Sequence, residues 1–79
     1  MIDVLFFGPV VERTGTRGLK VEHRQGMTLK HLRDELAAKY PGAFEIVCLA
    51  AVDGQHARDL TMPLADRSEV TFMARFSGG

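Results

Sequence analysis

Four stretches of the chain carry the hydrophobic pattern of β-strands. Residues 1–7 are apolar on both faces apart from Asp3, which predicts a central strand. Residues 19–24 alternate apolar and charged side chains along much of their length, which is typical of a half-solvated strand at the edge of a sheet. Residues 46–52 are continuously apolar and predict a buried strand, and the renewed alternation of residues 69–75 predicts the last strand.

Turn-forming residues divide these stretches. Asp53-Gly54 follows the third strand directly and is a strong hairpin signal, so a short return strand is expected near residues 56–59. Gly8-Pro9 ends the first strand. The segment from Val10 to Gly15 is short, and it predicts either one helical turn or an irregular loop.

One segment has the pattern of an amphipathic helix, residues 28–39. Thr28 is a good N-cap residue, and Met27 before it can pack on Leu32 as a hydrophobic staple. Pro41 disfavours helical geometry at the residue before it, and Gly42 completes the stop signal.

The predicted order is strand, strand, helix, strand, short strand, strand, which favours an α+β fold over a regular βα alternation. If the first and last strands lie parallel in the middle, one helix can cross a single face of the sheet. This is the β-grasp, or ubiquitin-like, roll, with a mixed sheet of four to five strands. We expect one domain over residues 1–79, with residues 76–79 as a flexible tail.

Composition and charge narrow the possible partners. Ten basic and ten acidic side chains leave no net charge, so the chain lacks the basic field that attracts nucleic acid. One cysteine cannot form an internal disulfide, which favours the cytoplasm. The longest apolar run is far too short for a membrane span, and residues 1–4 do not have the pattern of a signal peptide, so we expect neither export nor a membrane partner.

The sequence shows none of the motifs typical of a metal site, a catalytic cysteine or a phosphate-binding loop. His23, His31 and His56 are spread along the chain without metal-ligand spacing, so no metal site is predicted. Cys48 lies in the apolar third strand, where a cysteine is most often a small buried hydrophobic residue. No glycine-rich segment has the form of a phosphate-binding loop. We therefore predict no catalytic residue and no bound cofactor.

The remaining feature is the sequence Phe76-Ser77-Gly78-Gly79, which follows the last strand. Glycine lacks a side chain, so such a tail can enter a narrow active site of another protein. A carboxylate at Gly79 is a poor acyl donor, but adenylation supplies a good leaving group that sulfide or a persulfide can displace. The product is a thiocarboxylate, whose ionised sulfur is a strong nucleophile.

Fold and tail together resemble the sulfur-carrier branch of the ubiquitin-like families, most closely the small subunit of molybdopterin synthase. The resemblance covers nearly the whole chain. It rests on Val4-Leu5-Phe6-Phe7-Gly8 with Glu12 and Gly15, on Thr28-Leu29 with Leu32 and Leu36, on Ala51-Val52-Asp53-Gly54, on Pro63-Leu64-Ala65-Asp66 with Glu69-Val70, and on Ser77-Gly78-Gly79.

The resemblance implies a sulfur-donating cosubstrate, with no catalysis of its own, in molybdenum cofactor biosynthesis. A ubiquitin-activating-like adenylyltransferase would use ATP to adenylate Gly79, and the large synthase subunit would receive the sulfur. Phe76, Ser77 and Gly78 would occupy the partner's channel. Phe7, Leu60 and Arg75 are candidates for partner docking, and Phe7, Leu60 and Phe76 for an exposed apolar patch.

Two positions depart from the family pattern. Val11 stands where members usually carry arginine, and Ala74-Arg75-Phe76 replaces a Pro-Pro-Val approach to the tail. Because of both departures, the protein that accepts the sulfur is not determined. A sulfur carrier for another pathway, such as that of thiamin, cysteine or a secondary metabolite, stays an alternative. Two further functional hypotheses are a ubiquitin-style protein modifier and a plain β-grasp binding module with an inert tail.

Overall fold

The computed structural model describes residues 1–74 of the 79-residue chain, and in these residues five strands form one mixed sheet. The elements follow one another as β1 (Ile2–Phe6), α1 (Pro9–Thr14), β2 (Gly18–Val21), α2 (Leu29–Lys39), α3 (Pro41–Phe44), β3 (Val47–Val52), β4 (Gln55–His56) and β5 (Glu69–Ala74). The strand order in the sheet is β2-β1-β5-β3-β4.

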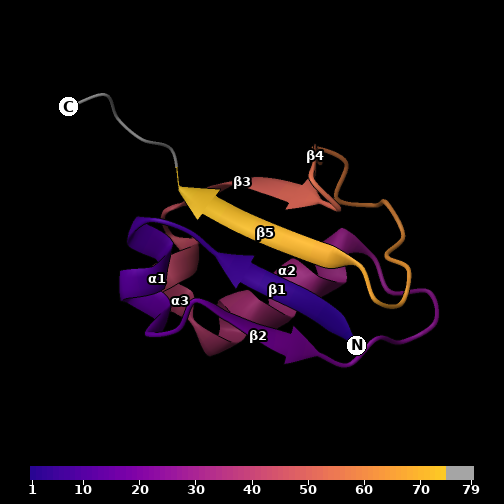
Figure 1. Ribbon diagram of the computed structural model, residues 1–79, viewed down its shortest axis with the longest axis horizontal. Helices are drawn as coiled ribbons and strands as arrows, with labels where there is room; N and C mark the ends of the chain where they lie inside the picture. The colour runs from indigo at the N-terminus through magenta and orange to yellow at the C-terminus, as the bar shows by residue number, and fades with distance from the viewer. Residues whose placement is uncertain (75–79) are drawn as a thin grey trace.

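The first and last strands lie side by side and parallel near the centre of the sheet, with Val4 opposite Val70. The other neighbouring pairs are antiparallel. Helix α2 crosses behind the sheet, and α1 and α3 pack together near the end at which β5 finishes (Figure 1). The α+β, β-grasp prediction is confirmed, as are the central place of the first strand and the edge place of the second.

The core lies between the inner face of the sheet and α2. Phe6 and Phe72 stand opposite each other on the two central strands and are almost completely buried. Their rings contact those of Tyr40 and Phe44, with centroid distances of 6.0 Å for Phe6–Tyr40 and 5.1 Å for Phe44–Phe72. Burial of each such ring contributes about 1.5–3 kcal/mol, so this cluster fixes the carboxyl end of α2 against β1 and β5.

Helix α2 begins where the sequence predicts. The Thr28 hydroxyl accepts a hydrogen bond from the His31 N–H at 3.2 Å, and His31 Nδ1 accepts one from the Thr28 N–H at 3.0 Å. This reciprocal pair satisfies two backbone N–H groups that would otherwise lack partners. Met27 and Leu32 are both buried in the core, as the staple prediction requires.

The stop signal after α2 has a further role that the sequence analysis missed. Tyr40 leaves helical geometry, as expected before proline, but Pro41 then opens the four-residue helix α3. Proline suits the first helical position because the N–H it lacks has no partner there. Ala43 and Phe44 are buried as a result, which adds an aromatic ring to the core.

Two strands are shorter than predicted. β2 ends at Val21, and His23 instead places its Nε2 2.7 Å from the Leu64 carbonyl oxygen. The tight turn at Asp53 and Gly54 is confirmed, with φ of 50° and 83°, the positive values that a two-residue hairpin turn requires. β4 covers residues 55–56 only, after which the chain turns toward the start of α2.

Cys48 was predicted to be buried, and this was wrong, because its side chain is exposed. The pairing of β3 with β5 shifts between Val47 and Leu49, which leaves Cys48 without an opposite residue. Such a bulge turns the extra residue out of the regular alternation. The rest of β3 is half-buried, because β4 accompanies only its last two residues.

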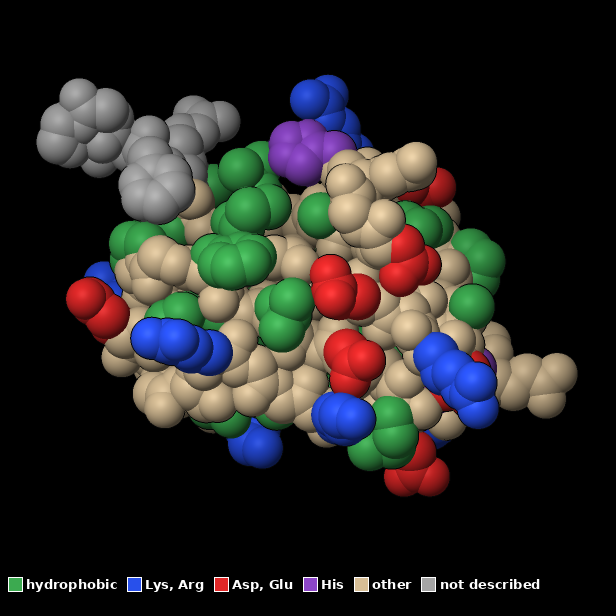
Figure 2. Space-filling model, viewed as in Figure 1, with side chains coloured by type: hydrophobic (Ala, Val, Ile, Leu, Met, Phe, Trp, Pro, Cys, Tyr) green, Lys and Arg blue, Asp and Glu red, His purple; other side chains and the backbone are tan. Residues whose placement is uncertain are grey.

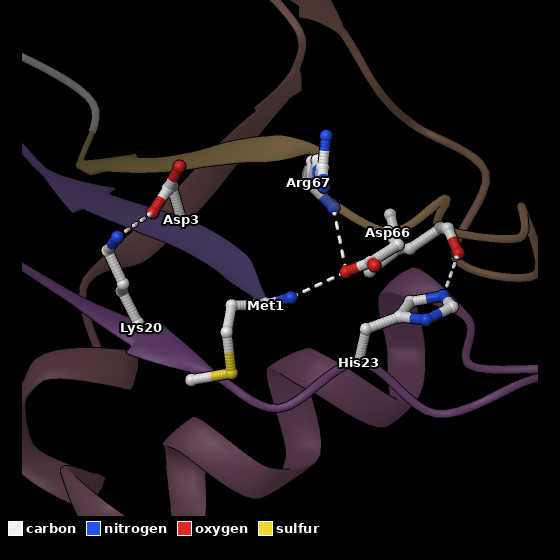
Figure 3. A network of polar contacts seen from close by, with 7 residues as sticks. Met1, Asp3, Lys20, His23, Asp66 and Arg67 are labelled. Carbon is white, nitrogen blue, oxygen red and sulfur yellow. Dashed lines mark hydrogen bonds and ion pairs between the residues drawn. The ribbon is translucent and has the colours of Figure 1, made fainter.

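Polar contacts tie the amino terminus to the segment before β5 (Figure 3). The Met1 amine donates to the Asp66 carboxylate, and the Arg67 N–H donates to the Met1 carbonyl at 3.0 Å. Next to them, Lys20 Nζ lies 3.7 Å from the Asp3 carboxylate. These contacts hold the starts of β1 and β5 in register. Within residues 1–74, no helix has the length and apolar character needed to cross a membrane.

Candidate functional site

The end of β5 is the point from which the predicted tail continues, and the sheet around it is asymmetric. β1 stops at Phe6, and Gly8, with φ of 59°, turns the chain into α1. The Phe7 N–H still donates to the Phe72 carbonyl at 3.4 Å, but Ala74 is paired only with Val47 of β3. β5 therefore runs past the end of β1, beside β3.

The face of the sheet away from α2 divides into a polar part and an apolar part. At the polar part, Asp3 and Glu69 lie opposite each other, with Lys20 next to Asp3. The other part lies toward the end of β5. We name it the apolar end of the open face: Leu5, Phe7, Leu49, Ala51 and Met73, all half-buried or exposed.

Strand geometry places these side chains together. Met73 pairs with Leu49, and Leu5 pairs with Thr71, two residues before Met73, so all three lie on one face. Continuing the alternation one residue past β1 places Phe7 beside Leu5, and Phe7 is 54% exposed. Figure 2 shows hydrophobic side chains gathered where β5 ends, with acidic side chains across the middle of the sheet.

The structure separates two residues that the sequence analysis placed in one patch. Leu60 is half-buried against the core, and its carbonyl accepts a hydrogen bond from the Lys30 N–H at 2.9 Å, at the start of α2. Phe7 follows Phe6, which packs on Tyr40 just past the end of α2. An 11-residue helix is about 16 Å long, so Leu60 does not lie beside Phe7.

The remaining predicted site residues, Arg75, Phe76, Ser77, Gly78 and Gly79, lie outside the described residues. Of the two positions that depart from the family pattern, Val11 is half-buried on α1 and packs against the core, while its neighbour Glu12 is exposed. A hydrophobic side chain at position 11 therefore has a packing role here.

Sequence reasoning missed Leu49 and Met73 as candidate partners of Phe7. A signal for Met73 was present, since it alternates with the buried residues Phe72 and Ala74 and so had to face away from the core. For Leu49 no local signal existed, because the bulge at Cys48 changes the face to which the next residue points.

The titratable side chains of residues 1–74 form no cluster with the make-up of a metal site. No three His, Cys, Asp or Glu side chains of this part of the chain come together. The carboxyl groups whose pKa is shifted are exposed, and each shift is downward. Hydrogen bonds from Lys30, from the Thr61 hydroxyl and from the Met1 amine are the main causes at Asp34, Asp59 and Asp66. These bonds stabilise surface carboxylates.

A family comparison matches almost the whole chain. The model of the ThiS family matches residues 4–79, which includes all of the predicted tail. A search of curated protein sequences gives no match.

Solved structures share the fold across the chain. SAMP1 from Haloferax volcanii has a TM-score of 0.84 at 20% identity, covering 99% of this chain and 98% of that one. The small archaeal modifier protein 1 from Methanosarcina acetivorans has a TM-score of 0.81 at 22% identity, covering 99% and 95%. A chain in the complex of subunits 1 and 2 of the molybdopterin-converting factor from Helicobacter pylori has a TM-score of 0.72 at 25% identity, covering 99% and 97%.

Proposed function

The chain belongs to the ThiS family of ubiquitin-like sulfur-carrier proteins with a β-grasp fold, and on this premise we propose that it carries sulfur on the α-carboxylate of Gly79. The observation that supports the proposal most is the match of the family model through the terminal Ser77-Gly78-Gly79. In this function the chain is a cosubstrate, and the catalytic groups belong to its partners.

The fold suits a reactive group outside the core. A domain of this size has room for one hydrophobic core, and the described side chains fill it with Phe6, Phe72 and their neighbours. Residues 75–79 span at most about 17 Å when fully extended, which is enough to carry Gly79 into another protein's active site. Gly78 and Gly79 add no side chain that a narrow channel would have to accommodate.

The chemistry proceeds in two steps on the partner. First, the Gly79 carboxylate attacks the α-phosphorus of ATP, which forms an acyl-adenylate and releases pyrophosphate. A hydrosulfide ion then attacks the acyl carbon, the new C–S bond forms, and the C–O bond to AMP breaks with AMP as the leaving group. The product is a thiocarboxylate, and sulfur enters and leaves without a change in its oxidation state.

The apolar end of the open face is the surface we assign to partner docking. Its five side chains are incompletely buried, and the large exposed Phe7 is the kind of aromatic residue that carries binding energy when a partner covers it. It lies at the end of the sheet where β5 finishes, so a partner that covers it is placed to receive the residues that follow Ala74.

For the acceptor we propose the large subunit of molybdopterin synthase. The support is the similarity to a chain in the complex of subunits 1 and 2 of the Helicobacter pylori molybdopterin-converting factor. An acceptor of another pathway would use the same Gly79 chemistry. Complementation of a strain that lacks the small synthase subunit separates the two, because only a molybdopterin carrier restores molybdoenzyme activity.

A second candidate function is protein modification. Two of the similar structures are described as small archaeal modifier protein 1, or SAMP1. The same acyl-adenylate, attacked by a lysine amine, would give an isopeptide bond with AMP as the leaving group. This function predicts conjugates in which Gly79 is linked to lysine side chains of other proteins.

Intact mass tests the main proposal. The protein is co-expressed with a ubiquitin-activating-like enzyme and a sulfur donor, then purified without a tag at its carboxyl end. We expect a species heavier by the difference between sulfur and oxygen, located at Gly79 by fragmentation. The matched control, Gly79→Ala, keeps the length of the tail. Absence of the heavier species and of ATP–pyrophosphate exchange with each cognate activating enzyme would overturn the proposal.

A further inference from the structure

A groove of about 420 Å³ lies on the helix side of the molecule and meets the apolar end of the open face only at Leu49. Its walls are the outer edge of β3, the segment after β4, and Arg33 on α2. The floor is apolar and includes Ala50, Leu60 and Phe72. Phe72 is 1% exposed and Ala50 and Leu60 are half-buried, so the floor offers little apolar surface and suits small aliphatic side chains better than a large planar ring.

The edge of β3 that borders the groove is incompletely paired. β4 pairs with Ala51 and Val52 only, and the Ala50 carbonyl accepts a hydrogen bond from the Ala57 N–H at 2.9 Å. In the described part of the chain, residues 47–49 have β5 on one side and no strand on the other. Figure 1 shows β4 beside only one end of β3. An unpaired edge of this kind is a template for an added strand.

The charge of the groove has one sign, although the whole chain is neutral. Its charged lining residues are Arg33 and Arg58, and no aspartate or glutamate lines it. Nearby acidic groups are engaged elsewhere, since Asp34 pairs with Lys30 and Asp59 accepts hydrogen bonds from Thr61. The ion pairs found in residues 1–74 involve neither Arg33 nor Arg58, so both guanidinium groups are available to an added carboxylate.

We propose that this groove binds an extended acidic peptide of a partner protein. The peptide adds to β3 as a short strand along residues 47–49, places aliphatic side chains over Leu60 and Ala50, and directs carboxylates toward Arg33 and Arg58. Backbone pairing supplies the hydrogen bonds, and the positive charge of Arg33 and Arg58 supplies the preference for acidic sequences.

A second copy of the chain fits this edge less well than a peptide. Pairing two copies edge to edge would bring Arg33 and Arg58 of one copy toward the same cationic groups of the other, which is unfavourable. The bulge at Cys48 also bends the edge, and a bent edge resists pairing with a second rigid sheet. A separate peptide can follow the bend.

The proposed site goes beyond the sulfur-carrier function, because it uses neither Gly79 nor Phe7 and shares only Leu49 with the apolar end of the open face. It borders the strand that pairs with Ala74, so a peptide in the groove and an enzyme acting on the tail would be neighbours. A partner could therefore hold the carrier by the groove while the open face exchanges between activating enzyme and acceptor.

Amide NMR of the full chain tests the proposal with the synthetic peptide acetyl-Val-Thr-Val-Thr-Val-Glu-Glu-Glu-amide. We expect shift changes at residues 47–50 and at Ala57, and none at Leu5 or Phe7. Replacing the central valine of the peptide with proline removes a backbone donor and should weaken binding at least about tenfold. The double variant Arg33→Gln, Arg58→Gln should weaken it about three- to tenfold, the range for two exposed ion pairs.

The control variant is Arg17→Gln, which removes an exposed arginine distant from the groove in the sheet and should leave the affinity unchanged. The single variant Arg58→Gln serves if the double variant is destabilised, and it should lose about two- to threefold. Several results would overturn the proposal: no shift changes at residues 47–50, equal binding of the proline peptide, equal binding of acetyl-Glu-Glu-Glu-amide, tighter binding of oligothymidylate, or self-association through β3.

Discussion

The Phe7 N–H donates a hydrogen bond to the carbonyl of Phe72, so the backbone of an exposed aromatic residue is bonded directly to the backbone of a buried one. This bond extends the pairing of β1 with β5 by one residue, so the backbone at Phe7 is fixed while its ring is 54% exposed. An exposed aromatic residue on a fixed backbone has little backbone entropy to lose when a partner covers it, which supports the proposed docking role of Phe7.

Replacing each of the two neighbouring phenylalanines by alanine in turn should separate the effect on docking from the effect on stability. Phe7→Ala should change the free energy of unfolding by less than about 1 kcal/mol and weaken binding to the activating enzyme about tenfold or more. Phe6→Ala should cost about 3–5 kcal/mol in stability because it leaves a cavity in the core. Urea unfolding and calorimetric binding measure both effects. A large loss of stability in Phe7→Ala with unchanged binding would contradict the assignment.

Extending the tail should block sulfur loading without affecting the fold. One alanine added after Gly79 displaces the reactive carboxylate, while the buried residues stay as they are. We expect no adenylation-dependent pyrophosphate exchange and an unchanged unfolding midpoint. A version whose extension a protease removes after Gly79 should regain full exchange. Exchange in the extended protein before cleavage would show that the carboxylate of Gly79 is not the acceptor of AMP.

The contact between Asp66 and the Met1 amine should make stability depend on acid pH. The hydrogen bond from the amine is the main reason that the pKa of Asp66 lies below the ordinary value of about 3.9. Because the folded pKa is lowered, this contribution is fully present above the ordinary pKa and is lost as the pH falls through the lowered one. Asp66→Asn should therefore be less stable than the original protein at neutral pH, with the difference shrinking in acid.

Acetylation of the Met1 amine supplies the control for this prediction. Acetylation removes the donor charge, so Asp66→Asn should cost less in the acetylated protein than in the free-amine protein. Chemical denaturation at about pH 7 and at about pH 2 measures the difference. A cost of Asp66→Asn that is the same at both pH values, with and without acetylation, would assign the effect to some other contact.

Cys48 should behave as a surface thiol. Because its side chain is exposed at the bulge, iodoacetamide should alkylate it in the folded protein at a rate close to that in urea. Cys48→Ser should change stability by less than about 0.5 kcal/mol, as expected for a surface position. Mass spectrometry and urea unfolding check the two results. Strong protection of the thiol in the free protein would mean that the edge of β3 is covered.

The prediction of the fold from sequence succeeded where the signal is local. The period-two pattern of β5, the cap at Thr28 and the turn at Asp53-Gly54 each concern residues that lie within a few positions of one another along the chain. The errors lie where the signal is not local. Pro41 ends α2 and also begins α3. The packing of Phe44 on Phe72, a contact between distant segments, is what stabilises α3.

The same distinction holds for the candidate site. The sequence singled out Phe7, and the structure shows it exposed, but the sequence analysis grouped it with Leu60, which lies at the other end of α2. It also placed Cys48 in the core, because an apolar strand gives no local sign of a bulge. Contacts between distant segments decide both points.

By itself the sequence determined the α+β order of elements and the β-grasp arrangement, since periodicity, capping and turn geometry depend on neighbours along the chain, and it supplied the prediction of chemistry at Gly79. The tertiary structure alone decided which hydrophobic side chains stay uncovered. That the open face is apolar near the end of β5 and polar near Asp3 and Glu69, and that a cationic groove borders β3, follows from the register of strands far apart in sequence. Exposure is set by what packs against a residue, and no local pattern contains that information.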